Sequence, residues 1–439
     1  MMRFRVLSGT TAAVAALAMA LTGCTPSAPS ADQQTVVYWS MLNKGEPTQL
    51  VLEKVIADFQ KENPDIKIQA NWAGRDVLTK IQAAVQAGTP VDIVDQSNDR
   101  LSAALLDNDL AVDLNPYLDE PAYGEDSGAW RDDFFKGSLD AMSVGRSGYL
   151  IPRDHFVSGI WYNAGMLKDA GVDVSTVGTT WDEFLAMLEK LKKANPDVSP
   201  LGADGSVDFY NNWWFSYLAI RLAGLEAFQA AAKDPTGEAW RAPEFLRAAE
   251  MVRDLQDRGY FQDGYQGSVY PAMQASWAQG KVAMFLNGAW IPNEMGAQVP
   301  KDFTMDVFAF PNIEGGKGND LVEYWSNAWS VLNTGKSTDA AVEFVKFASS
   351  PKKGAAMIAD SGIPMPINDV KVPAAYAGQN EILSSYDQIE QRAGLQGMTS
   401  YSADVYNFCD DPFFLGKATP TEFIDCLATT GAKFWASAK

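Results

Sequence analysis

The chain has 439 residues, of which 47% are hydrophobic and 21% are charged, so it is long enough for two or more domains with sizeable cores. Its net charge of −20 argues against nucleic acid as a partner, because binding to phosphates requires a basic surface. The single histidine excludes a His-rich metal site, and we predict neither a metal nor a cofactor.

The N-terminus has the features of an export signal. Arg3 and Arg5 precede a run of apolar and small residues that ends in Leu-Thr-Gly-Cys24. This pattern is typical of a signal peptide, and Leu-x-Gly-Cys resembles the lipobox of bacterial lipoproteins. The resemblance implies a signal peptide over residues 1–23, cleavage before Cys24 and acylation of that cysteine. The alternative is an ordinary secretory peptide with a chance cysteine.

Export from the cytosol leads to expectations about the tether, the membrane anchor and the remaining cysteines. Residues 24–34 are rich in proline, serine and alanine, which predicts a flexible tether. No later run approaches the roughly 18 apolar residues that a membrane-spanning helix needs, so we expect a lipid anchor at the extracytoplasmic face of the cell membrane. Outside the cytosol a cysteine pair is expected to be oxidised, which predicts a disulfide between Cys409 and Cys426.

The first part of the mature chain alternates strands with helices. Apolar residues at period two predict strands, and those at helical spacing predict helices. This alternation favours an α/β fold with mostly parallel sheets flanked by helices, and the G-x-G-x-x-G of a Rossmann fold is missing after the first strand. The predicted order is strand 36–39, helix 47–61, strand 66–71, helix 77–86, strand 91–94 and a helix from about Arg100.

The later parts continue the pattern. Extended segments over 149–152 and 158–162 surround the polar break Arg153-Asp154-His155. Thr180 and Glu183 predict a capping box for a helix over 181–194. The other predicted helices cover 166–170, 208–224, 244–258, 270–279 and 339–349, the strands cover 281–286, 305–308 and 326–332, and 311–320 is a glycine-rich connector.

One stretch combines a strand end with an aromatic residue. The strand over 281–286 is followed by Asn287-Gly288, which we expect to break it, then by Trp290 and the helix-initiating Pro292. In open α/β sheets, ligands bind beyond the carboxyl ends of the strands. Trp290 is therefore either a core residue or a platform for a ligand, and these residues alone leave both readings open.

The order of several segments resembles a known family, the extracellular solute-binding proteins of ABC importers. The resemblance is closer to its maltose-binding-protein-like, sugar-binding branch, and it extends over nearly the whole mature chain. The matching segments, in order, are YWSM with the helix that ends in ADFQKENP, DIVDQSNDRLSAALLDNDLAVDL, IPRDHFVSGIWYNAGML, TWDEFLAMLEKLK, ASWAQGKVAMFLNGAW and AVEFVKFASSP.

The resemblance implies a two-lobed, periplasmic-binding-protein-like fold of type II that closes over a ligand in the cleft between the lobes. Three inter-lobe crossings are expected near residues 152–158, 310–324 and 362–368. The N-terminal lobe would contain residues 35–153 plus 324–361, and the C-terminal lobe would contain residues 154–323 plus 362–439.

A sugar offers ring hydroxyls and apolar C–H faces, so its site needs aromatic rings together with carboxylate, amide or guanidinium groups. The resemblance matches Asp99-Arg100 to a pair that holds sugar hydroxyls, and Trp290 to a stacking tryptophan. The candidate ligand residues are Trp39, Asn43, Glu46, Asp95, Gln96, Asp99, Arg100, His155, Asp208, Tyr210, Asn211, Trp213, Trp290, Trp325, Asn327 and Trp329.

Several candidates have a structural alternative. Asp99 is also placed to cap a helix, and a lone histidine such as His155 is more often a structural hydrogen-bonding group than a ligand group. Strand alternation is expected to direct Trp325, Asn327 and Trp329 to one face of the sheet.

Together these observations predict a monomeric, lipid-anchored receptor, not an enzyme, that captures a sugar and delivers it to an ABC permease through hinge closure. An oligosaccharide is the expected ligand, and a polyol stays possible in principle. One alternative is a secreted glycosidase that uses a carboxylate pair such as Asp99 and Asp208. Another is a sensor or adhesin that binds the same sugar without transport.

Overall fold

The computed structural model describes residues 33–142, 146–206, 208–390, 395 and 397–437. The predicted signal peptide 1–23, the lipobox Cys24 and most of the predicted tether 24–34 lie outside these residues. Within the described part of the chain, no helix is long and apolar enough to cross a membrane.

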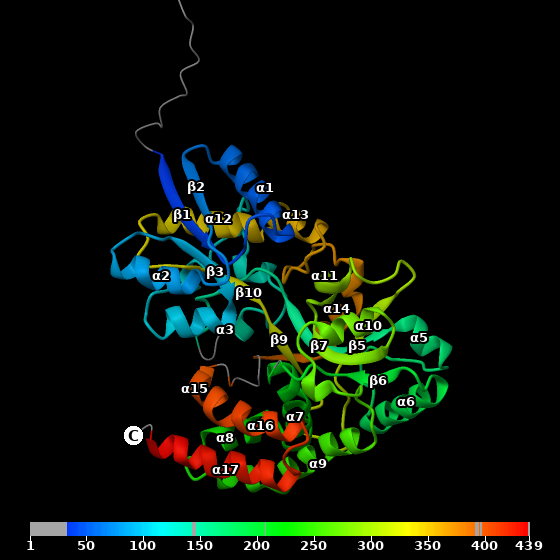
Figure 1. Cartoon of the computed structure of the whole chain (residues 1–439). Coiled ribbons are helices and arrows are strands. Elements are labelled where there is room, and N and C mark those ends of the chain that lie inside the picture. The colour runs from blue at the N-terminus through cyan, green and yellow to red at the C-terminus, as the bar shows by residue number, and fades with distance from the viewer. Residues whose placement is uncertain (1–32, 143–145, 207, 391–394, 396, 438–439) are drawn as a thin grey trace, which may run out of the picture.

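Five strands form the first sheet, in the upper half of Figure 1, in the order β2-β1-β3-β10-β4. The strands are β1 (Gln34–Ser40), β2 (Ile66–Trp72), β3 (Ile93–Ser97), β4 (Ile151–Pro152) and β10 (Asn327–Val331). The helices that follow these strands in sequence are α1 (Pro47–Glu62), α2 (Val77–Gln86), α3 (Asn98–Leu101), α4 (Asn115–Leu118), α12 (Thr338–Ser349) and α13 (Gly354–Asp360).

Six strands form the second sheet, in the order β11-β9-β5-β7-β6, with β8 paired to β5. The strands are β5 (Phe156–Asn163), β6 (Ser199–Gly202), β7 (Val282–Gly288), β8 (Met305–Phe308), β9 (Leu321–Trp325) and β11 (Asp387–Glu390). The helices around it are α5 (Ala164–Asp169), α6 (Trp181–Ala194), α7 (Asp208–Ala223), α8 (Leu225–Lys233), α9 (Pro243–Asp257), α10 (Ala272–Ala278), α11 (Ile291–Met295), α14 (Ala377–Ser385), α15 (Thr399–Tyr401), α16 (Phe408–Phe414) and α17 (Pro420–Ser437).

Local sequence explains the main helices. In α1, Leu52, Val55 and Phe59 recur at helical spacing and are all buried, so this face packs into the core while the other face stays in water. In α6, the Thr180 hydroxyl accepts a hydrogen bond from the backbone N–H of Glu183, and the Glu183 carboxylate accepts one from the backbone N–H of Thr180. The predicted capping box is thus confirmed.

The two sheets are mixed, which differs from the mostly parallel sheets expected. β1 runs parallel to β2 and β3, but β10 runs antiparallel to β3 and β4. In the second sheet, β5 is antiparallel to β7, β8 and β9. The antiparallel pairs arise because the chain returns from one sheet to the other, and a returning strand runs against its new neighbours.

Three stretches of chain connect the two sheets, as the two-lobed fold requires. Residues 153–155 join β4 to β5, and Ser326 alone separates β9 from β10. The third stretch, after α13, includes Pro364, whose carbonyl accepts a hydrogen bond from the His155 backbone N–H at 3.2 Å. The second connection is short: Trp325 ends a strand of the second sheet, and Asn327 begins a strand of the first.

Two strands extend beyond their expected ends. β3 continues to Ser97 because Asp95 and Gln96 pair with Trp329 and Ala328 of β10, so these two residues lie within the strand and not in a loop after it. β7 likewise continues through Asn287-Gly288, which pairs with β5 and does not break the strand.

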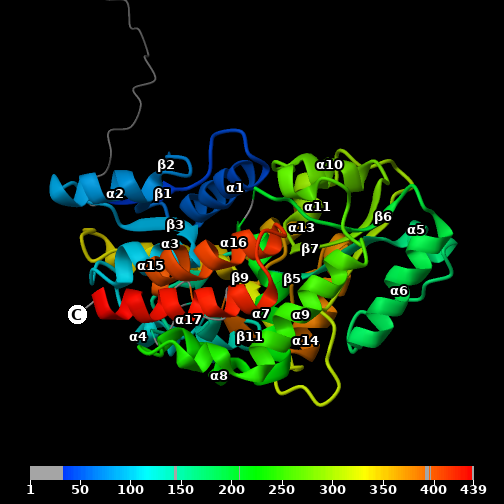
Figure 2. The ribbon, with the colours of Figure 1, turned by 60° about the horizontal axis from the view of Figure 1, so that its bottom comes forward.

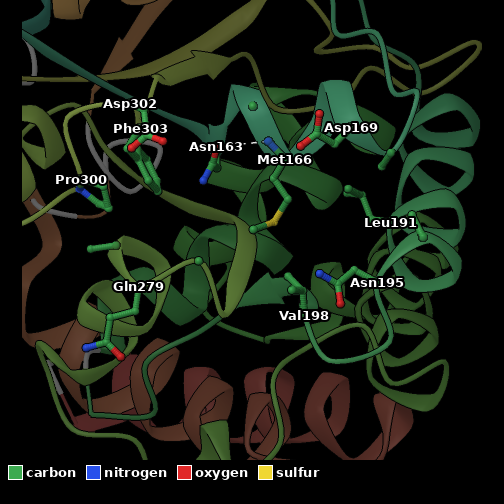
Figure 3. A pocket seen from close by; sticks show the side chains of 15 residues that line it. Asn163, Met166, Asp169, Leu191, Asn195, Val198, Gln279, Pro300, Asp302 and Phe303 are labelled. Atoms are coloured by element: carbon green, nitrogen blue, oxygen red, sulfur yellow. Dashed lines mark hydrogen bonds between the residues drawn. The ribbon is translucent and has the colours of Figure 1, made fainter.

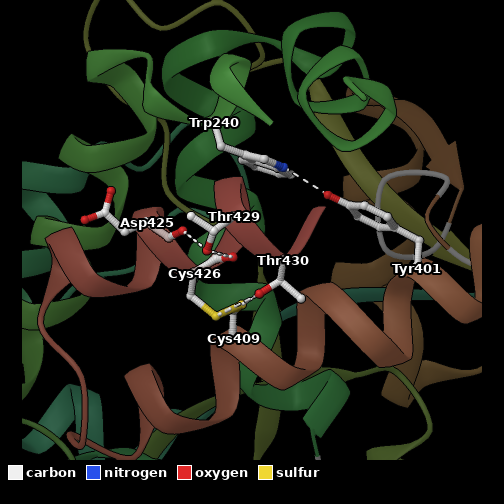
Figure 4. The surroundings of a disulfide bond; sticks show 7 residues. All are labelled: Trp240, Tyr401, Cys409, Asp425, Cys426, Thr429 and Thr430. Atoms are coloured by element: carbon white, nitrogen blue, oxygen red, sulfur yellow. Dashed lines mark hydrogen bonds between the residues drawn. A yellow bond between two sulfur atoms is a disulfide. The ribbon is translucent and has the colours of Figure 1, made fainter. Parts of the chain in front are cut away.

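The C-terminal helices pack against the second lobe, where α17 contacts α9 and α16 contacts α7 (Figures 1 and 2). A disulfide joins Cys409 of α16 to Cys426 of α17, with a Cα–Cα distance of 5.7 Å (Figure 4). Beside it, the Trp240 indole N–H donates to the Tyr401 hydroxyl at 3.0 Å. These helices are therefore tied both to each other and to the core beneath them.

Candidate functional site

A cleft of about 720 Å³ lies between the two sheets, within the size range of small-molecule sites. Both sheets contribute to its walls, and so do the first and third connecting stretches, through Arg153, Asp154 and Ile363. Among the residues predicted for the ligand site, the cleft is lined by Glu46, Gln96, Asp99, Arg100, Tyr210, Trp290, Trp325 and Asn327. Residues that the sequence did not indicate also line it, namely Met41, Leu42, Thr48, Arg75, Ser97, Arg153, Asp154, Phe156, Asn293, Glu294 and Ile363.

Aromatic rings form one wall of the cleft. The rings of Trp290 and Tyr210 are stacked at a centroid distance of 6.0 Å and an interplanar angle of 22°. Trp325 meets Trp290 edge-on, at 5.7 Å and 73°, and Phe156 lies 5.2 Å from Trp325. Trp290 and Trp325 are only half-buried, so they form an apolar corner against which the C–H face of a ligand can pack.

Gly288 sets the position of Trp290. A Cβ atom on residue 288 would lie 2.0 Å from the Cζ3 atom of the Trp290 ring, which therefore occupies the space that a side chain would need. Gly288 itself is held in β7 by its pairing with Ser158. The glycine that was expected to end the strand instead makes room for the aromatic wall.

The change Gly288→Ala should push Trp290 out of the cleft wall. We expect a loss of about 1–3 kcal/mol in the free energy of unfolding, because the added methyl overpacks a buried site. Gly267→Ala is the matched control, since a Cβ there would meet nothing within 4 Å. Chemical unfolding of both variants tests this, and equal stabilities for the two would contradict the assigned role.

The floor of the cleft is a buried charged cluster. Arg153 is 2% exposed, and its Nη1 donates to Asp95 Oδ2 at 2.8 Å while its Nη2 lies 3.4 Å from Asp154 Oδ2. Asp95 is fully buried and also accepts hydrogen bonds from the Ser40 hydroxyl, the Tyr38 hydroxyl and the Met41 backbone N–H. Asp95 therefore lies behind the cleft and holds Arg153, which lines it.

Asp154 ties two of the connecting stretches together. Its Oδ1 accepts a hydrogen bond from the Asn327 backbone N–H at 2.7 Å, and its Oδ2 accepts one from Asn327 Nδ2 at 2.9 Å. The Ser326 hydroxyl donates to the Asp154 carbonyl oxygen at 2.6 Å. Burial raises the pKa of the Asp154 carboxyl above its ordinary range, although Arg153 and Asn327 oppose that shift.

The rim of the cleft carries a second ion pair. Arg75 Nη2 lies 3.0 Å from Glu46 Oε2, and Asn43 Nδ2 donates to Glu46 Oε1 at 2.7 Å. Partial burial opposes ionisation of Glu46, but the hydrogen bonds from Arg75 and Asn43 outweigh it and lower the pKa of this carboxyl. On the opposite lobe, burial raises the pKa of Glu294, although the polar side chains of Gln274 and Tyr270 oppose that shift.

Three polar atoms at the cleft are buried and have no hydrogen-bond partner among the described residues. They are the Nε of Arg153, the Oδ1 of Asp99 and the Oδ1 of Asn327. One is a donor and two are acceptors, and each side chain lines the cleft. Each of these three side chains can therefore take one further hydrogen bond from a group that reaches it.

Several predicted ligand residues lie elsewhere. Trp329 is fully buried in the first lobe, where its indole N–H donates to the Tyr38 hydroxyl at 3.3 Å. Strand alternation did not carry Trp325 and Trp329 to one face, because the chain changes sheets at Ser326 between them. Asp95 also lies behind the cleft.

Other candidates support the second lobe or the connections. Trp213 is buried and donates through its indole N–H to the Glu323 carboxylate at 2.5 Å, beneath the aromatic wall. Asn211 and His155 are buried away from the cleft, and Trp39 packs partly against the first core. Asn43 reaches the site only through Glu46, and the side chain of Asp208 lies outside the part of the chain described.

His155 gives stability a pH dependence. Its ring lies 6.0 Å from that of Phe135 and 6.3 Å from that of Tyr324. Burial lowers the pKa of His155 from an ordinary 6.5 to about 3. Below about pH 6.5 the unfolded chain therefore binds a proton that the folded chain excludes, so stability is lost as the pH falls. At pH 5 the loss from this group is about 2 kcal/mol.

This expectation is tested with His155→Gln, because the chain contains one histidine. Urea unfolding of both proteins at pH 7.5 and pH 5 should show that the variant loses about 2 kcal/mol less than the natural protein on acidification. Identical losses for the two proteins would mean that His155 is not kept neutral by burial.

A second hollow, of about 460 Å³, lies within the second lobe between α5, α6 and α10 (Figure 3). Asn163, Met166 and Gln279 are among its lining residues. Asn163 already uses its side chain to accept a hydrogen bond from the Met166 backbone N–H, which begins α5. None of its lining side chains, all of them in described segments, has a buried polar atom without a partner, so this hollow lacks the signature of the cleft.

A family model of bacterial extracellular solute-binding proteins matches residues 44–355 of the chain. The chain belongs to this family. The two-lobed arrangement and the cleft at the connections are those of a solute-binding protein, and they confirm the fold predicted from the resemblance. Within the described residues, no cluster of three or more His, Cys, Asp or Glu side chains is placed to hold a metal ion.

Known relatives agree with this assignment. The solute-binding protein is 24% identical to the multiple sugar-binding protein of Streptococcus mutans over 355 residues, which cover 80% of each chain. It is 20% identical to the melibiose/raffinose/stachyose-binding protein MelE of Bacillus subtilis, over 83% of this chain and 82% of that one. The structure of the sugar-binding protein MalE from Xanthomonas citri superposes with a TM-score of 0.73 at 18% identity, covering 92% of this chain and 98% of that one.

Proposed function

We propose that this solute-binding protein captures an uncharged saccharide in the cleft and delivers it unchanged to an ABC permease. The observation that carries the proposal is the set of three buried, unpartnered polar atoms, on Arg153, Asp99 and Asn327, beside the corner of Trp290 and Trp325. A sugar supplies both kinds of partner at once, hydroxyls for the polar atoms and a C–H face for the rings.

The charges of the cleft support an uncharged ligand. Arg75 is paired with Glu46, and Arg153 is paired with Asp95 and Asp154, so most of the charge is already compensated within the protein. An anionic or cationic ligand would have to compete with these pairs. Relatives whose names specify sugars point in the same direction.

Delivery to a permease is proposed because the chain belongs to the family of extracellular solute-binding proteins. We propose that acylated Cys24 anchors a monomer at the outer face of the membrane and that the tether 24–34 lets it reach the permease. The lobes, with borders near residues 153, 324 and 361, would close on the ligand because contacts from both sides stabilise the closed form. No chemistry on the sugar is required, which distinguishes the protein from a glycosidase.

The test is a calorimetric screen of maltotriose, raffinose, melibiose and N,N′-diacetylchitobiose, with glucose 6-phosphate as a charged comparison. We expect at least one neutral sugar to bind with a Kd in the micromolar range or below, and to be recovered intact by mass spectrometry. Cleavage of the bound sugar would support the glycosidase alternative, and binding of the phosphate ester alone would contradict an uncharged ligand.

A further inference from the structure

The guanidinium of Arg153 is held by two carboxylates, and its side chain is one of those that line the cleft. Its two terminal nitrogens are engaged by Asp95 and Asp154, both of them buried carboxylates. Its Nε has no partner among the residues that the structure describes, although the side chain is 2% exposed. A charged donor held in this way costs several kcal/mol of desolvation unless another group accepts its hydrogen bond.

Arg153 lies next to Asn327 at the place where the chain passes between the two sheets. Arg153 is the first residue after β4, within the connection between the sheets, and its backbone N–H donates to the Asn327 carbonyl oxygen at 2.7 Å. Asn327 begins β10, directly after the connection at Ser326, and its own Oδ1 is buried and lacks a partner among the described side chains. Arg153 and Asn327 thus present one donor and one acceptor at the cleft floor.

We propose that Arg153 is a specificity-determining ligand residue, that its Nε–H donates to a ring hydroxyl of the sugar, and that Asp95 is the positioning residue that aims it. The inference rests on the proposed function and adds to it the side chain that recognises one hydroxyl of the bound sugar. A hydroxyl placed between the two would accept from Arg153 and donate to Asn327 Oδ1, so the pair would select a group with both capacities. A ring lacking that hydroxyl leaves both atoms unsatisfied, which is the strongest basis for rejecting a ligand.

Asp95 does not line the cleft but holds two residues that do, Arg153 through its guanidinium and Met41 through its backbone N–H. It is fully buried, and its carboxylate is surrounded by Arg153, Ser40, Tyr38 and the Met41 backbone N–H. Tyr38 is also buried, and burial raises its pKa, so this tyrosine stays protonated and donates to Asp95. We therefore expect a change at Asp95 to alter binding chiefly by releasing the charged Arg153 side chain.

The experiment measures Kd by calorimetry with maltotriose, raffinose and N,N′-diacetylchitobiose on four proteins: the natural chain, Arg153→Lys, Asp95→Asn and the double variant. Lysine keeps the charge but has no Nε donor in a planar fork. We expect Arg153→Lys to weaken the best-bound sugar at least 30-fold and Asp95→Asn at least 5-fold. The double variant should bind no more weakly than Arg153→Lys, because Asp95 acts chiefly through the arginine.

The matched control is Arg221→Lys, since Arg221 is also fully buried but lies in α7 away from the cleft. It should lower the stability while leaving Kd within twofold, which separates a binding role from a purely structural one. Where Arg153→Lys fails to fold, ¹⁵N spectra of the arginine Nε–H groups in the natural protein replace it. Adding the best-bound sugar should then shift a resonance that Asp95→Asn also shifts.

The outcomes distinguish the role of Arg153 from the binding of a sugar in the cleft. If the natural protein binds a sugar and Arg153→Lys binds it within twofold of the same Kd, or no such Nε–H resonance moves, the inference about Arg153 is wrong and the proposed function stands. Additive losses in the double variant overturn the positioning role of Asp95. If the natural protein binds none of the neutral sugars, melibiose included, the proposed function fails, and the inference fails with it.

Discussion

Replacing Asp154 with alanine is expected to cost about 3–5 kcal/mol of stability, because it leaves two buried hydrogen-bond donors of Asn327 without an acceptor and removes a carboxylate from the buried charged cluster. The carboxylate accepts two hydrogen bonds from Asn327 and lies against Arg153. After its removal, the Asn327 backbone N–H and amide lose their acceptor at the point where two connections meet. Asp154→Asn should cost less, since it keeps one acceptor oxygen.

The effect should be specific to the connections between the sheets. Asp119→Ala is the matched control, because it also removes a carboxylate paired with an arginine, but this pair with Arg131 is largely exposed. Exposed pairs contribute about 1 kcal/mol or less. Guanidinium chloride unfolding of the three variants measures the difference. A loss for Asp154→Ala no greater than that for Asp119→Ala would show that the tie between the connections carries little stability.

Arg221→Ala is the second change expected to have a large effect, about 3–5 kcal/mol in the free energy of unfolding. Arg221 is fully buried in α7 and donates to the backbone carbonyls of Phe310, Pro311, Gly318 and Leu321. These carbonyls begin and end the glycine-rich connector. Without the guanidinium these carbonyls stay buried without a donor. Burial also lowers the pKa of Arg221, as expected for a cation that is shielded from water.

The control for Arg221 is Arg247→Ala, whose side chain is 64% exposed beside Glu250. Thermal unfolding should show a large fall in Tm for Arg221→Ala and almost none for Arg247→Ala. Amide exchange in residues 311–320 should rise selectively in the first variant, because the connector has lost its anchor. A uniform change across the protein would point to a general loss of packing.

The fold was largely predictable because its signals are local. Helical spacing of apolar residues identified α1, and Thr180 with Glu183 identified the start of α6. The extent of β3 and β7 was missed, because their last residues are polar or glycine and are held by pairing with other strands. The antiparallel pairs in both sheets were also missed, because the direction of a strand depends on how the chain crosses between the two sheets.

The cleft was predictable where aromatic residues line it, at or just after a strand end for Trp290 and Trp325 and at the start of α7 for Tyr210. Trp290, Tyr210 and Trp325 were expected to meet a ligand, and they form one wall of the cleft. For Arg153 and Asp154 the sequence predicted only a polar break between two apolar segments. Such a break does not indicate the direction of a side chain. Asp95 and Trp329 were misplaced for the same reason, because burial behind the cleft depends on tertiary packing.

Calorimetry on Trp290→Ala tests most directly whether a sugar binds in this cleft against Trp290. We expect the best-bound neutral sugar of the screen to bind about 30-fold more weakly to this variant, since a central aromatic contact contributes about 2 kcal/mol. Asp99→Asn, which changes a buried acceptor while preserving shape, should weaken the same sugar without a large loss of stability. A Kd within twofold of the natural value in both variants would place the ligand elsewhere and contradict the account.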